Sequence, residues 1–224
     1  TSLQFLWLGN TSVTDAGLMH FKGLTGLQML DVQGTKITDA GLGHLKGMNL
    51  HTLNIPQHAK TDLGLKHFLA AVEAPVKLEL AACKITDAGL EHLKGLQNLQ
   101  SLNLYRTQVT GAGLVYIKRL TNLKTLILSQ ASITDAGLVH LKGMTSLQFL
   151  WLGNTSVTDA GLVHFKGLIG LQMIDLQGTQ VTDAGLVHLK GLTKLRMLAL
   201  RNTQITDAAI TELKQALPKC KIAK

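Results

Sequence analysis

Histidine recurs at one position of a repeated segment, and this row is the first place where the sequence offers groups capable of chemistry. Imidazoles in a row suit metal binding or pH sensing. Each histidine, however, comes from a separate repeat and has no second ligand four residues away. We therefore interpret the row as a solvated feature of the repeat and expect no metal site. The row consists of His20, His44, His67, His92, His140, His164 and His188.

Lysine forms a second row, which accounts for much of the net charge of +8. A regular basic ridge can attract nucleic acid or an anionic membrane surface. Against this, an aspartate usually precedes the lysine in the same segment, and no aromatic residues are interleaved with the row to stack on bases. Polyanion binding stays a weaker alternative, and we expect neither nucleic-acid nor membrane partners. The row consists of Lys22, Lys46, Lys94, Lys118, Lys142, Lys166, Lys190 and Lys214.

The sequence contains no set of residues arranged for catalysis. Its glycines are spread singly at repeat spacing rather than gathered in a phosphate-binding loop, and no serine lies in a G-x-S-x-G turn. Cys83 and Cys220 lie too far apart along the repeats for a disulfide and have no metal-ligand or redox spacing. We expect no enzyme, no cofactor and no metal.

All of these residues belong to one segment that recurs nine times with a 24-residue period. Each unit opens with L-x-x-L-x-L, in which the alternation of leucine predicts a short strand with one buried face. Successive strands run in the same direction, so they can pair only as a parallel sheet. The second strand leucine recurs as Leu6, Leu30, Leu53, Leu78, Leu102, Leu126, Leu150, Ile174 and Leu198.

The second half of each unit, T-D-A-G-L-x-H-L-K-G, must carry the chain back to the next strand. Threonine followed by aspartate and a helix-spaced pair such as Leu90 and Leu93 indicates an N-cap and the first helical turn. We therefore expect a short helix in every unit, with a capping threonine at Thr14, Thr38, Thr61, Thr86, Thr110, Thr134, Thr158, Thr182 and Thr206.

These motifs resemble the leucine-rich repeat superfamily over essentially the whole chain. The T-D-A-G-L signature is similar to bacterial repeats and to the broad ribonuclease-inhibitor-like group. The resemblance implies an α/β solenoid shaped like a horseshoe, with a parallel β-sheet on the concave face and short helices on the convex face. We expect residues 1–224 to form a single domain of nine repeats, followed by a terminating strand at residues 220–223.

The residues that fill the concave face are the most individual part of the sequence. Tryptophan, tyrosine and arginine are enriched at interface hot spots, and the fold does not require aromatic residues there. We predict a protein-binding surface and keep open the alternative that wide side chains merely cover a crowded sheet. The candidate residues are Phe5, Trp7, Tyr105, Arg106, Phe149, Trp151, Asp175 and Arg201.

Two functions from different classes follow from this. The favoured hypothesis is a non-enzymatic module that binds a protein or peptide through its concave sheet; the alternative is a structural spacer or surface adhesin. Residues 1–47 and 145–191 are identical at 40 of 47 positions, so the Phe-Trp pair occurs twice. This duplication is consistent with two equal docking sites or with a recent crossover alone.

The ends and the third repeat depart from the pattern. The sequence begins inside a repeat, without Met or a signal peptide, so we expect a piece of a longer protein and self-association through its uncapped N-terminal edge. In the third repeat, Pro56 follows the strand and Lys60 replaces the usual Val or Ile. We expect this repeat to be the least stable unit, because a poor unit weakens the interfaces to its neighbours.

Overall fold

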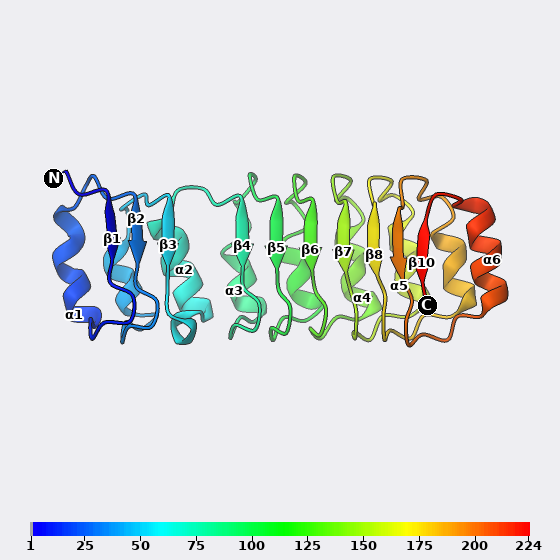
Figure 1. Cartoon of the computed structure of the whole chain (residues 1–224), viewed down its shortest axis with the longest axis horizontal. Coiled ribbons are helices and arrows are strands. Elements are labelled where there is room, and N and C mark those ends of the chain that lie inside the picture. Colours follow the sequence, from blue (N-terminus) through cyan, green and yellow to red (C-terminus); the bar gives the residue numbers. More distant parts are fainter. Residues whose placement is uncertain (1) are drawn as a thin grey trace.

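The computed structural model describes residues 2–224, in which short strands alternate with short helices along one axis (Figure 1). Every strand pair in these residues is parallel. The terminating strand expected at the C-terminus is β10, which pairs with β9. The strands are β1 (Phe5–Trp7), β2 (Met29–Asp31), β3 (Thr52–Asn54), β4 (Lys77–Glu79), β5 (Ser101–Asn103), β6 (Thr125–Ile127), β7 (Phe149–Trp151), β8 (Met173–Asp175), β9 (Met197–Ala199) and β10 (Lys221–Ala223).

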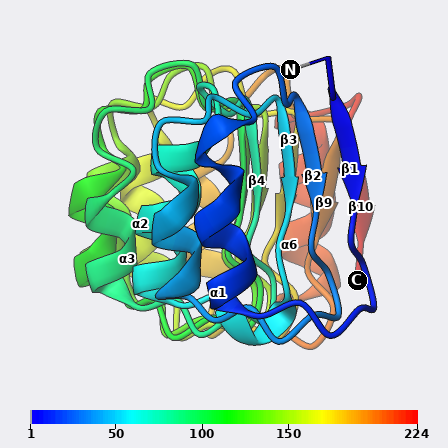
Figure 2. The same ribbon diagram turned by 90° about the vertical axis from the view of Figure 1, so that its left-hand side faces the viewer.

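Helical segments cover one side of the strands and leave the other side open (Figure 2). In the end view the first and last strands, β1 and β10, lie further out on the strand side than β4, so the array curves with the strands on its inner side. This is the horseshoe expected from the repeat. The α-helices are α1 (Asp15–Leu18), α2 (Asp62–Ala71), α3 (Asp87–Glu91), α4 (Asp135–Leu138), α5 (Asp159–Leu162) and α6 (Asp207–Ala216).

Several repeats return through a 3-10 helix instead of, or after, an α-helical turn. These segments are η1 (Met19–Gly23), η2 (Gly41–Leu45), η3 (Gln57–Ala59), η4 (Ala112–Tyr116), η5 (Val139–Leu141), η6 (Val163–Phe165) and η7 (Asp183–His188). No helix in residues 2–224 is long and apolar enough to cross a membrane.

The threonine caps are present in some repeats and absent in others. Thr61 and Thr206 precede the ten-residue helices, and their hydroxyls accept hydrogen bonds from the N–H of Gly64 and Ala209 at 3.1 and 3.2 Å. The hydroxyls of Thr14, Thr134 and Thr182 make no capping bond, so the expectation of a capped helix in every unit is wrong.

Aspartate joins most repeats to the next, a role that its place at the start of a helix did not reveal. One carboxylate oxygen of Asp159 accepts the N–H of Thr182 at 2.8 Å, and the other accepts its hydroxyl at 2.6 Å. Such double hydrogen bonds to a charged carboxylate pair polar groups across the boundary between repeats and help to set the spacing of adjacent repeats. The same pair of bonds joins Asp15 to Thr38, Asp62 to Thr86, Asp87 to Thr110, Asp135 to Thr158 and Asp183 to Thr206.

Two repeats show what replaces this aspartate–threonine bridge. Gly111 replaces the aspartate in the fifth repeat, and the backbones of Gly111 and Gly137 pack directly against each other instead. In the ninth repeat the partner of Asp207 is a lysine: Lys224 Nζ donates to its carboxylate at 2.6 Å. This contact lowers the pKa of the Asp207 carboxyl.

The parallel sheet is in two parts. β1, β2 and β3 form one sheet and β4 to β10 form the other, with no pairing between β3 and β4 (Figure 1). The buried side chains divide in the same way into two clusters, and half-buried Phe68 packs against both. The third repeat stays paired with the second in full register, so its irregular sequence interrupts one strand interface rather than two.

Two residues explain the interruption. Pro75 stands where the other units have the first strand leucine, and proline supplies neither a leucine's volume nor an N–H. Lys60 stands where the other units bury Val or Ile. The third and fourth repeats remain joined after these strands end. Thr61 and Lys84 form an isolated parallel β-bridge, and Gln57 Nε2 donates a hydrogen bond to the carbonyl of Ala82 at 3.3 Å.

Backbone hydrogen bonds support the prediction that the third repeat opens most easily. In residues 56–62 the backbone N–H groups donate hydrogen bonds only within their own repeat, as Ala59 N–H does to the Pro56 carbonyl at 3.1 Å. In residues 104–110 the amides reach both neighbouring repeats: Leu104 N–H donates to Ile127 at 2.8 Å, and Gln108 N–H donates to Ile85 at 2.9 Å.

We therefore expect faster amide hydrogen exchange in residues 56–62 than in residues 104–110, because local opening breaks fewer contacts there. Residue-resolved exchange measured by NMR tests this. Equal protection of the two segments would contradict it.

Candidate protein-binding surface

The first and third residues of each strand point away from the helices, and the surface that they form is called the sheet face below. The middle residue points into the core: Leu150 is fully buried, whereas Phe149 and Trp151 on either side of it are half-buried. The alternation of a strand therefore places the aromatic residues outside the core, as the sequence predicts.

Phe149 and Trp151 form a stacked pair on the sheet face. Their ring centroids are 6.1 Å apart and their planes are inclined by 23°. Strands on both sides limit the exposure of the two rings. The cross-strand neighbours are Thr125 and Ile127 on β6 and Met173 and Asp175 on β8.

The duplicated pair, Phe5 and Trp7, has the same geometry but a more open setting. The ring centroids are 6.0 Å apart and the planes are inclined by 18°. Trp7 is 63% exposed and Phe5 is 47% exposed, because β1 has a neighbouring strand on one side only. The two copies are therefore equal in sequence and unequal in environment.

Asp175 lies directly beside Trp151 on the neighbouring strand, and only one of its two carboxylate oxygens takes part in a hydrogen bond within residues 2–224. One carboxylate oxygen accepts the N–H of Gln177 at 2.9 Å, which shapes the turn after β8. Gly153 follows the tryptophan by two residues, and a Cβ there would lie 2.8 Å from the other carboxylate oxygen. The absence of a side chain at Gly153 leaves space for this carboxylate next to the aromatic pair.

The remaining candidates do not converge on Trp151. Tyr105 and Arg106 lie in the turn after β5, where Tyr105 is half-buried and Arg106 is exposed with a positive φ of 52°. Arg201 is exposed in the turn after β9. All three therefore lie along one edge of the sheet face, two strands before or after β7, and not beside the stacked pair.

The polar residues around Trp151 differ in exposure. Ser129 is only 9% exposed, and its hydroxyl accepts the N–H of Gly153 at 3.1 Å. Gln130 next to it is exposed in a left-handed turn with φ of 58°, and Gln177 on the other side is half-buried. The rim is therefore formed by these two glutamines together with Asp175.

The histidine row is less solvated than the sequence suggests. His20 and His92 are exposed, whereas the other members are half-buried. His67 Nδ1 lies 2.8 Å from the carbonyl of Asp39, so it joins the third repeat to the second. Within residues 2–224, no group of three or more His, Cys, Asp or Glu side chains is placed to hold a metal ion.

The lysine row is partly paired. Lys94 Nζ lies 2.8 Å from Glu91, which lowers the pKa of the Glu91 carboxyl, and 4.6 Å from the centre of the Tyr116 ring. Lys190 Nζ lies 2.6 Å from Glu212. The helix-start aspartates do not offset these lysines directly, because their carboxylates bind threonines of the following repeat.

Both cysteines are free and buried. Burial raises the pKa of the Cys83 and Cys220 thiols.

The sequence pattern identified Lys60 only as a destabilising residue. The structure places it beside the open edges of β3 and β4, and its polar type at an otherwise apolar repeat position was the available signal.

The chain resembles known repeat proteins in sequence and in structure. A family model described as "Leucine Rich repeat" matches residues 119–141. No curated protein matches the sequence. Solenoids of stacked repeats present extended concave binding surfaces.

Two solved structures with this architecture are internalins of Listeria monocytogenes. Internalin C2 (inlC2) is 25% identical, with a TM-score of 0.53, over 98% of this chain and 80% of that chain. The internalin inlF is 23% identical, with a TM-score of 0.71, over 100% of this chain. The chain spans 61% of the length of that inlF chain. Together with the 24-residue period and the parallel strand-helix repeats, these similarities show that the chain has the fold of a leucine-rich-repeat solenoid.

Proposed function

We propose that the chain is a non-enzymatic module that binds a protein or peptide through its sheet face, with Phe149 and Trp151 as the anchor. The observation that carries this proposal is the stacked, half-buried aromatic pair, which lies outside the core and is flanked by strands on both sides. Other strands have polar residues at the same two positions, such as Ser101 and Asn103 in β5, so the fold does not require aromatic residues there.

The area still exposed on this pair is available to a partner. Burial of apolar surface stabilises a complex by about 25 cal/mol per Å² before the costs of association are subtracted. Met173 and Ile127 extend the apolar centre to the neighbouring strands. Asp175, Gln177 and Gln130 give the edge hydrogen-bonding groups, which matches the apolar centre and polar rim of a recognition surface.

The chemistry of this surface favours a particular kind of partner. An apolar side chain would cover the stacked rings, and a hydrogen-bond donor or basic group beside it would meet the carboxylate of Asp175. We expect the duplicated pair to contribute less, because Phe5 and Trp7 are flanked on one side only and cannot surround an inserted side chain.

A displayed library of random peptides tests the proposal. Peptides selected on the wild-type chain are expected to share an apolar residue followed or preceded by Lys or Arg. They should fail to bind a Phe149→Ser/Trp151→Asn double variant, which copies the polar residues of β5 and retains the fold. A selection that yields no enriched peptides, or peptides that bind the double variant equally well, would favour a structural spacer instead.

A further inference from the structure

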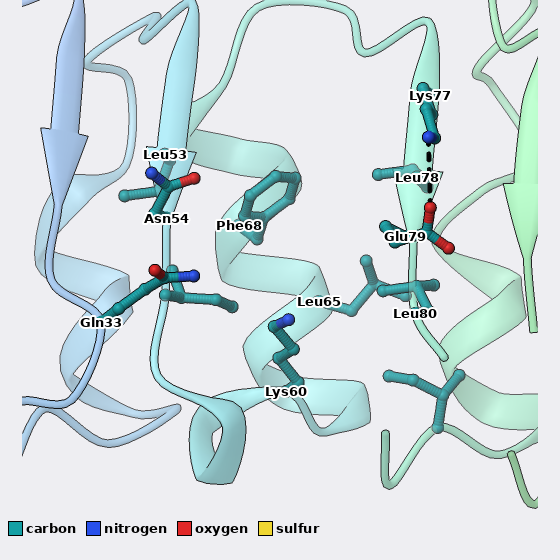
Figure 3. Close-up of a pocket in the computed structure, with 12 residues that line it drawn as sticks. Gln33, Leu53, Asn54, Lys60, Leu65, Phe68, Lys77, Leu78, Glu79 and Leu80 are labelled. Atoms are coloured by element: carbon teal, nitrogen blue, oxygen red, sulfur yellow. Dashed lines mark ion pairs between the residues drawn. The ribbon is translucent and has the colours of Figure 1, made fainter. Parts of the chain in front are cut away.

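The interruption between β3 and β4 leaves two strand edges facing each other across a cavity of about 260 Å³ (Figure 3). The cavity opens on the sheet face, since the outward-facing residues Asn54, Lys77 and Glu79 line it together with inward-facing leucines. It lies between β3 and β4, whereas Phe149 and Trp151 lie on β7, with β5 and β6 between, so the cavity is separate from the aromatic pair.

The backbone groups along these edges have no strand partner. In β3, Thr52 N–H donates to Gln28 at 3.1 Å and the Asn54 carbonyl accepts from Val32, so the groups of both residues point toward β2. Because these directions alternate along a strand, the N–H and C=O groups of Leu53 and the N–H of Ile55 point toward β4.

The facing edge of β4 has the same property. The Val76 carbonyl and the Leu80 N–H are bonded to β5, through Ser101 and Asn103. The N–H and C=O groups of Lys77 and Glu79 therefore point toward β3. An unpaired strand edge is a template for another extended chain, and here two such edges face one space.

The floor of the cavity is apolar except for one cation. Leu53 and Leu78 lie at its sides, and Leu65 and Phe68 of α2 lie beneath (Figure 3). Lys60 projects into the same space and is half-buried. Within residues 2–224 its ammonium group has no hydrogen-bond or ion-pair partner, whereas Lys77 is paired with Glu79 at 3.3 Å.

A partly buried ammonium group beside apolar walls is costly unless an anion or acceptor meets it. The position is also one where the repeat otherwise buries Val or Ile, so an aliphatic residue there would be compatible with the fold. The cavity thus combines hydrogen-bonding edges for an extended backbone, an apolar floor and an unpaired positive charge.

From this combination we propose that the cavity binds an extended peptide segment of a partner protein, which enters as an additional strand between β3 and β4 and places a carboxylate against Lys60. The inserted strand bonds to both edges. Its alternate side chains point inward, so an apolar residue meets Leu53, Leu65 and Leu78, and an acidic residue two positions away meets Lys60.

Titration with a defined probe tests this proposal. The probe is the peptide acetyl-Lys-Leu-Thr-Leu-Thr-Glu-Lys-amide, which alternates inward Leu, Leu and Glu with polar residues. On binding, the exchange of the Leu53, Ile55, Lys77 and Glu79 amides should slow at least about tenfold. Exchange of the Thr52 amide should not change, because it is already bonded to β2. This alternation distinguishes strand insertion from binding across the surface.

Two control peptides and two matched variants separate the contributions. Replacing Glu by Gln in the probe should weaken binding about tenfold, and N-methylation of its central residues should abolish binding. Lys60→Ile introduces the residue type found in other repeats, so it should fold normally and bind the probe at least about tenfold more weakly. Lys84→Ala removes an exposed positive charge of the next repeat and should bind like the wild type.

The proposal is overturned if the probe does not bind at millimolar concentration, if Lys60→Ile binds equally well, or if binding leaves the Leu53 and Lys77 amides unprotected. It is independent of the function proposed for the sheet face. Trp151→Ala should bind this probe like the wild type, so failure at one site does not imply failure at the other.

Discussion

Gly137→Ala is expected to lower the free energy of unfolding by about 3 kcal/mol, because the added methyl group has no space between two backbones. A Cβ at Gly137 would lie 2.9 Å from the carbonyl oxygen of Gly111 and 3.0 Å from its carbonyl carbon. These atoms belong to the backbone of the preceding repeat and cannot rotate away as a flexible side chain can. The two repeats must therefore move apart, which also loosens the leucine contacts between them.

Gly143→Ala is the matched control for this substitution. It lies in the same repeat, a Cβ there would have no atom within 4 Å, and its φ is not in the left-handed region. It should change the free energy of unfolding by no more than about 0.5 kcal/mol, toward stabilisation. Urea unfolding of both variants measures the difference. Equal midpoints would show that the fifth and sixth repeats are not packed through Gly111 and Gly137.

The second large effect is expected on binding rather than on stability. Trp151→Ala should weaken the peptides selected on the wild-type chain by at least about tenfold, since removal of an aromatic anchor typically costs about 2 kcal/mol or more. The unfolding midpoint should stay close to that of the wild type, because Trp151 lies outside the core. Fluorescence anisotropy of a labelled peptide and thermal unfolding measure the two quantities.

Two comparisons make this result specific. Trp7→Ala removes the same residue from the duplicated pair and should weaken binding less, because Trp7 is 63% exposed and flanked by one strand. Leu150→Ala removes a fully buried neighbour and should cost about 2–5 kcal/mol of stability. Unfolding of Trp151→Ala would show that the tryptophan supports the core. Unchanged binding would exclude this part of the sheet face as the site.

The local pattern of the sequence was sufficient for the repeat architecture. Alternation around Leu150 placed Phe149 and Trp151 together on one face, and the structure has them there as a stacked pair. The fold class and the terminating strand β10 follow the prediction as well. Such features are predictable because every repeat contacts chiefly its neighbours, so the same short pattern produces the same local structure each time.

The environment of the candidate residues was less predictable. Sequence position alone made the Phe5–Trp7 and Phe149–Trp151 pairs equivalent, and it grouped Tyr105, Arg106 and Arg201 with them. In the structure, exposure depends on how many strands flank a position, and the turns after β5 and β9 hold these other residues apart from Trp151. This depends on distance along the solenoid axis, which no single repeat contains.

Contacts between repeats were decided only by the tertiary structure. The sequence places Asp159 at the start of a helix, but only the stacking of repeats brings its carboxylate to Thr182 of the next one. Likewise, Pro75 and Lys60 are 15 positions apart in the sequence, yet their combined loss of apolar packing leaves β3 and β4 unpaired. A local pattern determines which face of a strand is buried. Pairing of two strands also requires that the two neighbouring repeats fill the space between them, and this depends on how the repeats pack together.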